Sequence, residues 1–123
     1  MPIGDGFANH PVKHLAYGLM PKSFGTFPQV LGSYVRDHAV LTLEEAVRKI
    51  TSEPARRLGL ADRGRLAPGM AADLVVFNPA TVGNRATEAA PATRPSGIAR
   101  VMVNGEWVVV DGVATGARPG RSL

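Results

Sequence analysis

The first regular pattern of apolar residues along the chain has the period of an α-helix. Between residues 27 and 38, apolar side chains recur at intervals of three and four positions, and this spacing places them on one face of a helix. Pro28 suits the first turn of such a helix, because proline is pre-organised for it. Residues 1–26 lack this period and predict a short strand end at 2–4 followed by a long loop. The helix-forming positions are Phe27, Val30, Leu31, Tyr34 and Val35.

A second helix is predicted for residues 43–51. Thr42 and Glu45 form a capping box, in which the threonine hydroxyl accepts a hydrogen bond from the Glu45 amide and the glutamate reaches back. One apolar stripe then continues along the helix. Ser52 can cap a further short helix, and Gly59 stands where a helix-terminating glycine is expected.

The second half of the chain has the pattern of β-structure. The run Ala72–Phe77 is a candidate for a buried strand, and a later apolar run contains Asn104-Gly105, the strongest two-residue signal for a hairpin turn. Asp111-Gly112 can turn the chain again. Residues 79–97, rich in Pro, Ala and Thr, predict an exposed loop. Helices followed by antiparallel strands indicate the α+β class.

Composition narrows the classes of function. The chain has 123 residues, whereas a (β/α)₈ barrel typically needs about 250. The net charge of +4 would suit a nucleic-acid or phosphate-binding surface. However, no aromatic residues alternate with the basic ones and no motif for reading a nucleic-acid groove is present, so we interpret the basic residues as a solvated surface. No apolar run is long enough to span a membrane, and no apolar leader is visible at the start. The absence of cysteine excludes disulfides and thiolate metal ligands. We therefore expect a cytoplasmic protein with neither a nucleic-acid nor a membrane partner.

A few polar residues are candidates for chemistry. Asp5 stands between two glycines after the predicted strand end, where its carboxylate is open to a ligand and can act as a general base, although Gly-Asp-Gly is more often only a turn. His10 and His14 have the spacing of two metal ligands on a helix, but Pro11 argues against a helix there and favours loop histidines. Asp73 begins a strand and is assigned a structural role, bonding to nearby backbone amides.

Longer motifs resemble one enzyme family. Residues 25–32 read Gly-Thr-Phe-Pro-Gln-Val-Leu-Gly, residues 63–77 contain Pro-Gly-Met-Ala-Ala-Asp-Leu-Val, and the tail from Thr115 reads Thr-Gly-Ala-Arg-Pro-Gly-Arg-Ser-Leu. In this order they resemble the carboxy-terminal portion of the N-acyl-D-amino-acid deacylases, or D-aminoacylases, of the amidohydrolase superfamily. Dihydroorotases, hydantoinases and adenine deaminases share the middle segment, and the tail favours the deacylases.

The resemblance implies a fold and a site. Residues 1–62 would be the last strand, loop and helices of a TIM barrel, and residues 63–123 would be part of a small β-sandwich. Asp5, followed by Gly6, matches the family's catalytic acid/base at the end of the eighth barrel strand. The family binds zinc through a His-x-His pair, further histidines and a cysteine or modified lysine from earlier strands. This chain lacks that set, so no metal ligand is assigned and the chain alone is expected to be catalytically incomplete.

Several positions depart from the family pattern. The resemblance assigns Gly6, Lys22, Gly25 and Thr26 to the substrate loop. Lysine stands there in place of arginine, and it cannot hold a carboxylate with arginine's two-point fork, so the family's substrate preference is not carried over. The other replacements are Met20 for His, Phe24 for Tyr, Gln29 for Arg and Gly4 for Ser.

Three interpretations of the chain remain at this point. The favoured one is a fragment of a deacylase that acts on a small N-acyl amino acid; the alternative activity is that of a cyclic amidohydrolase such as dihydroorotase or hydantoinase. The second is one half of a split enzyme whose partner chain bears the barrel and the zinc. The third is a β-rich module that has lost catalysis. Without a barrel the helices lack partner surface, so we expect the chain to associate with itself or with a partner.

Overall fold

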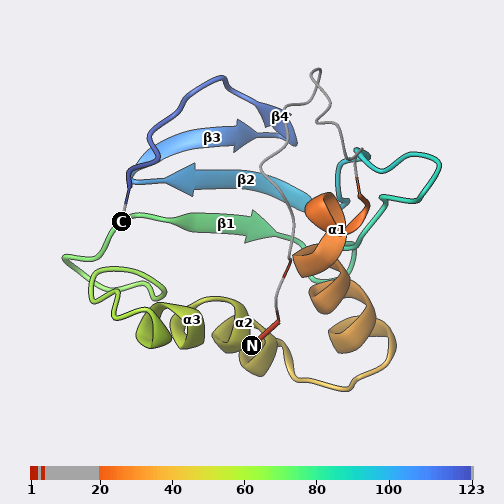
Figure 1. The fold of residues 1–123 in the computed structure, drawn as a ribbon, viewed down its shortest axis with the longest axis horizontal. Helices are drawn as coiled ribbons and strands as arrows, with labels where there is room; N and C mark the ends of the chain where they lie inside the picture. Colours follow the sequence, from red (N-terminus) through yellow and green to blue (C-terminus); the bar gives the residue numbers. More distant parts are fainter. Residues whose placement is uncertain (3, 5–19, 123) are drawn as a thin grey trace. The chain divides into compact units, whose positions relative to one another are not determined.

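The computed structural model describes residues 1–2, 4 and 20–122 (Figure 1). Within this part of the chain, helical segments precede a four-stranded antiparallel sheet, which confirms the α+β class. The helical segments are α1 (Lys22–Gln29), η1 (Val30–Asp37), α2 (Leu43–Ile50) and α3 (Ser52–Arg57). The strands are β1 (Leu74–Phe77), β2 (Ile98–Val103), β3 (Glu106–Val110) and β4 (Val113–Ala114).

The chain divides into two compact units, each built from distant segments. The helix unit comprises Pro2–Ala46 and Pro79–Gly97, and the sheet unit comprises Met1, Val47–Asn78 and Ile98–Leu123. The connection between β1 and β2 therefore leaves the sheet unit, contributes to the helix unit and returns. The domain boundary predicted after residue 62 concerns the barrel of the parent enzyme and stays a prediction.

The first helix begins five residues earlier than the apolar pattern predicts. Backbone hydrogen bonds start it, from the Ser23 amide to the Met20 carbonyl (3.0 Å) and from the Gly25 amide to the Pro21 carbonyl (2.9 Å). Pro28 consequently lies inside α1 and not in its first turn. From Val30 the backbone continues as the π-helix η1. The pattern missed the start because residues 22–26 carry no apolar stripe.

Residues 79–97 form the loop that their composition predicts, exposed for instance at 87–90, but the loop also packs onto this helix. Val82 is completely buried, and its carbonyl oxygen accepts a hydrogen bond from the Arg36 guanidinium. A Cβ at Gly32 would stand 2.6 Å from the same carbonyl oxygen. Glycine at this position is therefore what allows the backbone of the segment to approach the helix.

The capping box of α2 is confirmed at its start. The Glu45 amide donates to the Thr42 hydroxyl over 3.2 Å. The expected cap on α3 is wrong: Ser52 is the first helical residue, Thr51 occupies the capping position, and the Thr51 hydroxyl donates to the Val47 carbonyl (2.7 Å). Gly59 follows the helix with φ of 71°, the left-handed conformation that a glycine after a helix supplies without strain.

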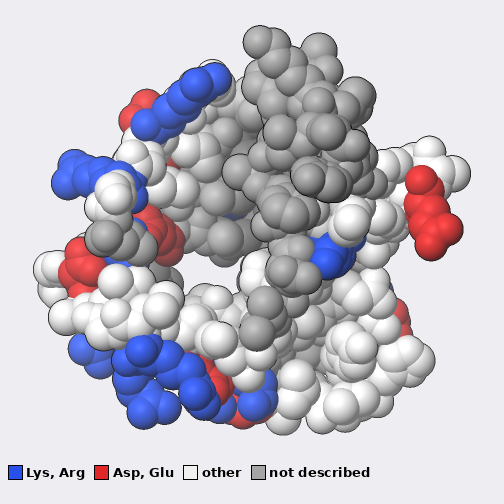
Figure 2. Space-filling view, viewed as in Figure 1, with Lys and Arg blue, Asp and Glu red and all other residues white. Residues whose placement is uncertain are grey.

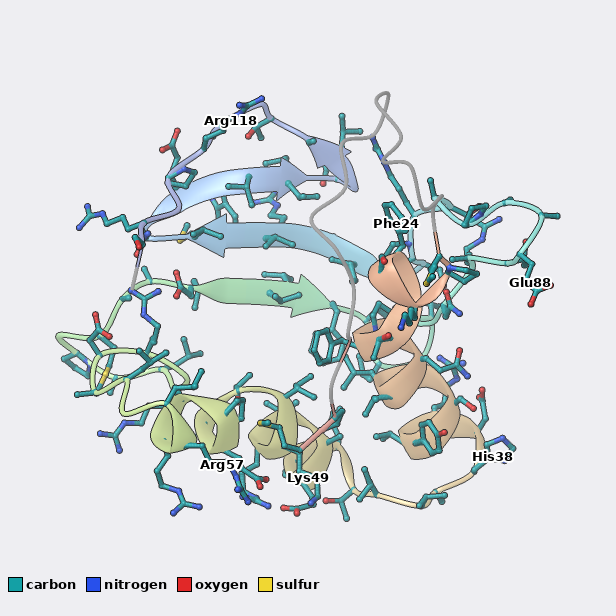
Figure 3. All side chains as sticks on the ribbon, viewed as in Figure 1. Phe24, His38, Lys49, Arg57, Glu88 and Arg118 are labelled. Carbon is teal, nitrogen blue, oxygen red and sulfur yellow. The ribbon has the colours of Figure 1, made fainter. Side chains whose placement is uncertain are left out.

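Glu53 is a buried carboxylate that ties α2 to α3. It forms ion pairs with Arg48 (3.2 Å) and Arg57 (3.4 Å), and the amino terminus lies 4.0 Å away. Figure 2 accordingly shows red atoms among the blue ones over these helices, and Figure 3 shows Lys49 and Arg57 projecting on the same side. Burial works to raise the pKa of Glu53, but the amino terminus, Arg48, Lys49 and Arg57 together hold this pKa below its ordinary value.

The sheet is a simple meander in the order β1-β2-β3-β4. Asn104 and Gly105 turn β2 into β3 with φ of 47° and 84°, and Asp111 and Gly112 turn β3 into β4 with φ of 50° and 74°. Both turns are therefore confirmed, since two positive φ values define the hairpin turn that Asn-Gly favours. The strands are apolar, yet their residues are half-buried or exposed. The buried strand expected at β1 is wrong in this respect, because Val75 is 54% and Val76 47% exposed.

Replacing Gly32 with alanine tests the packing of Val82 on the helix. An alanine in an ordinary helix position stabilises relative to glycine by about 1 kcal/mol. Here we expect the opposite, a loss of about 1–3 kcal/mol in the free energy of unfolding, because the methyl group meets the Val82 carbonyl. Urea titration followed by circular dichroism measures the change. Gly120→Ala is the matched control, since a Cβ at Gly120 has open space around it; a Gly32→Ala chain as stable as the control would contradict the packing.

Acidification tests the Glu53 ion pairs. Because the folded-state pKa of Glu53 is lowered, its contribution to stability is complete above the unfolded-state pKa and is lost as the pH falls through the folded-state pKa. The free energy of unfolding of the natural chain should therefore fall more steeply with acid than that of Glu53→Gln. Glu44→Gln, at an exposed position on α2, should keep the steep dependence. Parallel curves for the natural chain and Glu53→Gln would refute this role.

Candidate functional site

The residue with the strongest sequence case for catalysis lies outside the described part of the chain. Asp5, Gly6, His10 and His14 all fall in residues 5–19. Gly4, directly before Asp5, is described: a Cβ there would stand 3.7 Å from the Phe27 ring of α1. The backbone that leads to Asp5 is thus close to the helix that carries the other candidate residues.

Lys22, Gly25 and Thr26 occupy the first half of α1. Lys22 is exposed at the first helical position. The Thr26 hydroxyl donates to the Lys22 carbonyl over 2.7 Å, so it serves the helix backbone. His38 follows η1 at the opposite end of the helical run, and Figure 3 shows it far from Phe24 of α1. The structure therefore groups these three predicted loop residues and leaves His38 away from them.

The structure explains why glycine stands at position 25, which the sequence did not reveal. It is buried, and a Cβ there would collide with the carboxamide of Asn84. Asn84 is fixed in turn by its own segment, because its side-chain oxygen accepts from the Ala86 amide (2.8 Å). Gly25 and Gly32 are thus the two points at which residues 82–84 approach the helix. An Asn able to bond the amide two residues on was the available signal for this turn.

An open groove of about 440 Å³ runs beside α1 and η1. Its described lining is mainly apolar and can hold an apolar group. Among the described lining residues, Tyr34 is the one with an ionisable side chain. The lining residues are Pro2, Thr26, Gln29, Val30, Tyr34 and Leu41.

Asp73 is confirmed as structural, with partners more distant than expected. Its carboxylate accepts from the Asn104 backbone amide (2.8 Å), 31 positions away, and from the Arg63 guanidinium (2.8 Å). The Gly105 amide donates to the Ala72 carbonyl (3.0 Å) beside it. Both oxygens of Asp73 are therefore occupied in holding the hairpin turn against the segment before β1.

The described residues do not fit the zinc that the resemblance implies. Among them, no group of three or more His, Cys, Asp or Glu side chains is placed to hold a metal ion, whereas a catalytic zinc site needs about three protein ligands and an open position. The same part of the chain has no helix with the length and apolar character needed to cross a membrane.

The chain belongs to the amidohydrolase family, which its sequence matches over residues 10–109. Within that family it is similar to the deacylases of N-acyl-D-amino acids. It is 49% identical over 119 residues to the N-acyl-D-glutamate deacylase of Alcaligenes xylosoxydans xylosoxydans, a match that covers 97% of this chain and 23% of that protein. The chain thus spans about a quarter or less of the length of such relatives.

Two solved structures of such deacylases are also similar to this chain. A D-aminoacylase variant in complex with copper(II) chloride has a TM-score of 0.81 at 50% identity, covering 84% of this chain and 22% of that one. The N-acyl-D-glutamate deacylase of Bordetella bronchiseptica, complexed with zinc and a phosphonate inhibitor that mimics the tetrahedral intermediate, has a TM-score of 0.71 at 49% identity, covering 75% and 20%. Both relatives were therefore solved with metal ions bound.

Removing the charge of Asp73 should destabilise the sheet unit. In Asp73→Asn, both the Arg63 and the Asn104 contacts lose a charged acceptor, so we expect the free energy of unfolding to fall by about 1.5–3 kcal/mol. Asp62→Asn is the matched control, because Asp62 also pairs with Arg63 (3.3 Å) but its side chain is 62% exposed; its loss should stay below about 1 kcal/mol. Equal losses in the two variants, measured by urea titration, would disprove the assigned role.

Proposed function

We propose that this chain is part of a metal-dependent amidohydrolase that hydrolyses N-acyl-D-amino acids. The supporting observation is the similarity to deacylases across 97% of the chain, at 49% identity. A cyclic amidohydrolase, the dihydroorotase of Lactobacillus acidophilus, matches 62% of the chain at 30% identity, so the longer and closer match favours deacylases. The reaction adds water to the amide carbonyl and yields a carboxylate and a D-amino acid.

Asp5 is the proposed acid/base of this reaction, with Gly6 giving its backbone room to turn. As the water oxygen bonds to the carbonyl carbon, the carboxylate takes the water's proton; it then delivers that proton to the nitrogen as the C–N bond breaks. The close approach of Gly4 to Phe27 supports a site beside α1. Lys22, Gly25 and Thr26 are proposed to border the substrate there. Asn84 packs against the helix that carries them, at Gly25.

The architecture that goes with this proposal is that of a composite enzyme. Residues 1–62 supply the end of a TIM barrel and residues 63–123 supply part of a β-sandwich. A four-stranded sheet with exposed apolar side chains supports the second assignment, because such a sheet is stable when another layer covers it. Zinc is held by other residues of the parent enzyme, or by a partner chain that bears the barrel.

Complementation tests this function. The chain would be produced alone and together with the part of a D-aminoacylase that precedes the matched region. We expect no deacylase activity and well under one zinc per chain for the chain alone. We expect N-acyl-D-amino-acid hydrolysis and bound zinc in the pair, measured by release of the free amino group and by elemental analysis.

Asp5→Asn is the decisive variant in the pair. Loss of a positioned acid/base should lower kcat by at least about 100-fold, while zinc content and assembly stay unchanged. Hydantoin or dihydroorotate turnover without N-acyl-D-amino-acid turnover would instead identify a cyclic amidohydrolase. A pair that assembles with zinc and hydrolyses none of these compounds would support the non-catalytic subunit.

A further inference from the structure

Asn104-Gly105 is a sequence prone to cyclisation, and in this chain hydrogen bonds hold both of its residues in place. Asn104 is half-buried and Gly105 is exposed at the tip of the β2–β3 hairpin. Glycine after asparagine leaves the following backbone nitrogen without side-chain hindrance. We propose that Asn104 is a self-modification site, at which cyclisation through Gly105 converts the asparagine to aspartate or isoaspartate. The conversion breaks the contact between Asn104 and the carboxy-terminal tail, and the chain itself is not cleaved. This site is independent of the proposed hydrolysis.

The chemistry needs only the two residues and water. The Gly105 backbone nitrogen attacks the side-chain carbonyl carbon of Asn104, and the new C–N bond closes a succinimide ring. The Gly105 proton leaves with the side-chain nitrogen as ammonia. Water then opens the ring at either carbonyl: one direction gives aspartate, and the other gives isoaspartate, in which the backbone runs through the side-chain carbon. No oxidation or reduction takes place.

Three hydrogen bonds restrain this reaction in the folded chain. The attacking Gly105 nitrogen donates its proton to the Ala72 carbonyl (3.0 Å). The departing Asn104 side-chain nitrogen donates to the Pro119 carbonyl (2.7 Å), and the Asn104 backbone amide donates to Asp73 (2.8 Å). The first two must be released before the ring can close. The rate of conversion should therefore follow the local opening of the turn.

The modification removes the contact that fixes the tail. Asn104 loses its donor to Pro119 when its amide becomes a carboxylate, and the new negative charge lies on the residue whose backbone amide already contacts the Asp73 carboxylate. Like charges at short range repel. Isoaspartate in addition lengthens the backbone within a two-residue turn that requires positive φ at both positions. The tail, marked by Arg118 in Figure 3, then loses its anchor to the hairpin.

Mass spectrometry of the aged chain tests this inference. The purified chain would be incubated at neutral pH, digested, and each asparagine peptide scored for replacement of the side-chain amide by a carboxyl group. Two other asparagines serve as internal controls: Asn78 precedes Pro79, which has no amide proton to give up, and Asn84 precedes Arg85. We expect conversion at Asn104, and the same conversion faster in denaturing urea.

A truncated chain isolates the role of the tail. A chain ending at residue 116 lacks the Pro119 carbonyl, and its Asn104 should convert about two- to tenfold faster, the factor expected from the loss of one hydrogen bond. Arg121→Ala keeps Pro119 and should convert at the natural rate. If the truncated chain does not fold, graded sub-denaturing urea on the full chain gives the same comparison.

Two results would overturn the proposal. One is conversion at Asn104 that is no faster in urea than in the folded chain, since the hydrogen bonds would then restrain nothing. The other is conversion at Asn84 equal to that at Asn104. The consequence for the tail is tested with Asn104→Asp, in which hydrogen exchange of residues 117–121 should accelerate while that of β3 remains slow; unchanged exchange of the tail would refute the release.

Discussion

The sheet unit depends on the carboxylate of Asp73. Its two oxygens join Arg63, in the segment before β1, to the amide of Asn104 at the hairpin tip, and Asn104 extends the connection to the Pro119 carbonyl in the tail. Three segments that are far apart in the sequence are therefore linked through Asp73 and Asn104. Two of them, residues 63–77 and the tail from Thr115, also carry the resemblance of the second half of the chain to the deacylases. The motif Ala-Asp-Leu-Val is thus explained by structure, since both oxygens of its aspartate are engaged and neither is left for catalysis.

The helix unit depends on close backbone approach at two glycines. Gly25 and Gly32 admit Asn84 and the Val82 carbonyl against the helix, and Arg36 donates to that carbonyl. An isolated bridge between Gly83 and Ser96 closes the approaching segment on itself. The segment 79–97 therefore contributes the fully buried Val82 to a unit whose other residues come from the first third of the chain. The motif Gly-Thr-Phe-Pro-Gln-Val-Leu-Gly begins and ends on these two glycines, so both of its end positions have a role in packing.

Local signals in the sequence predicted local structure well. The capping box at Thr42, the Asn104-Gly105 turn and the Asp111-Gly112 turn each depend on residues within a few positions of one another, and each is confirmed. The start of α1 and the burial of Val82 were missed, because they depend on backbone bonds and on a partner about fifty positions away. The role of Asp73 was predicted, but its partner was expected nearby. Of the candidate site, the sequence located Lys22, Gly25 and Thr26 on one segment, while the roles of Asp5 and Gly6 stay predictions.

The exposed side chains of the sheet unit connect its stability to its proposed chemistry. Leu58, Leu66 and Val113 are 60% exposed or more. Val75 and Val76 on β1 are about half exposed. Fully burying one such side chain stabilises by about 1.5–3 kcal/mol, so a covering layer would be strongly favoured. Among its described residues the chain also has no group of three or more side chains placed to hold a metal ion, and a relative binds zinc. Under the proposed function, the remainder of a deacylase would supply the metal ligands and would also offer a surface to cover these residues. Stable folding and activity are thus expected to arise together when the two parts assemble.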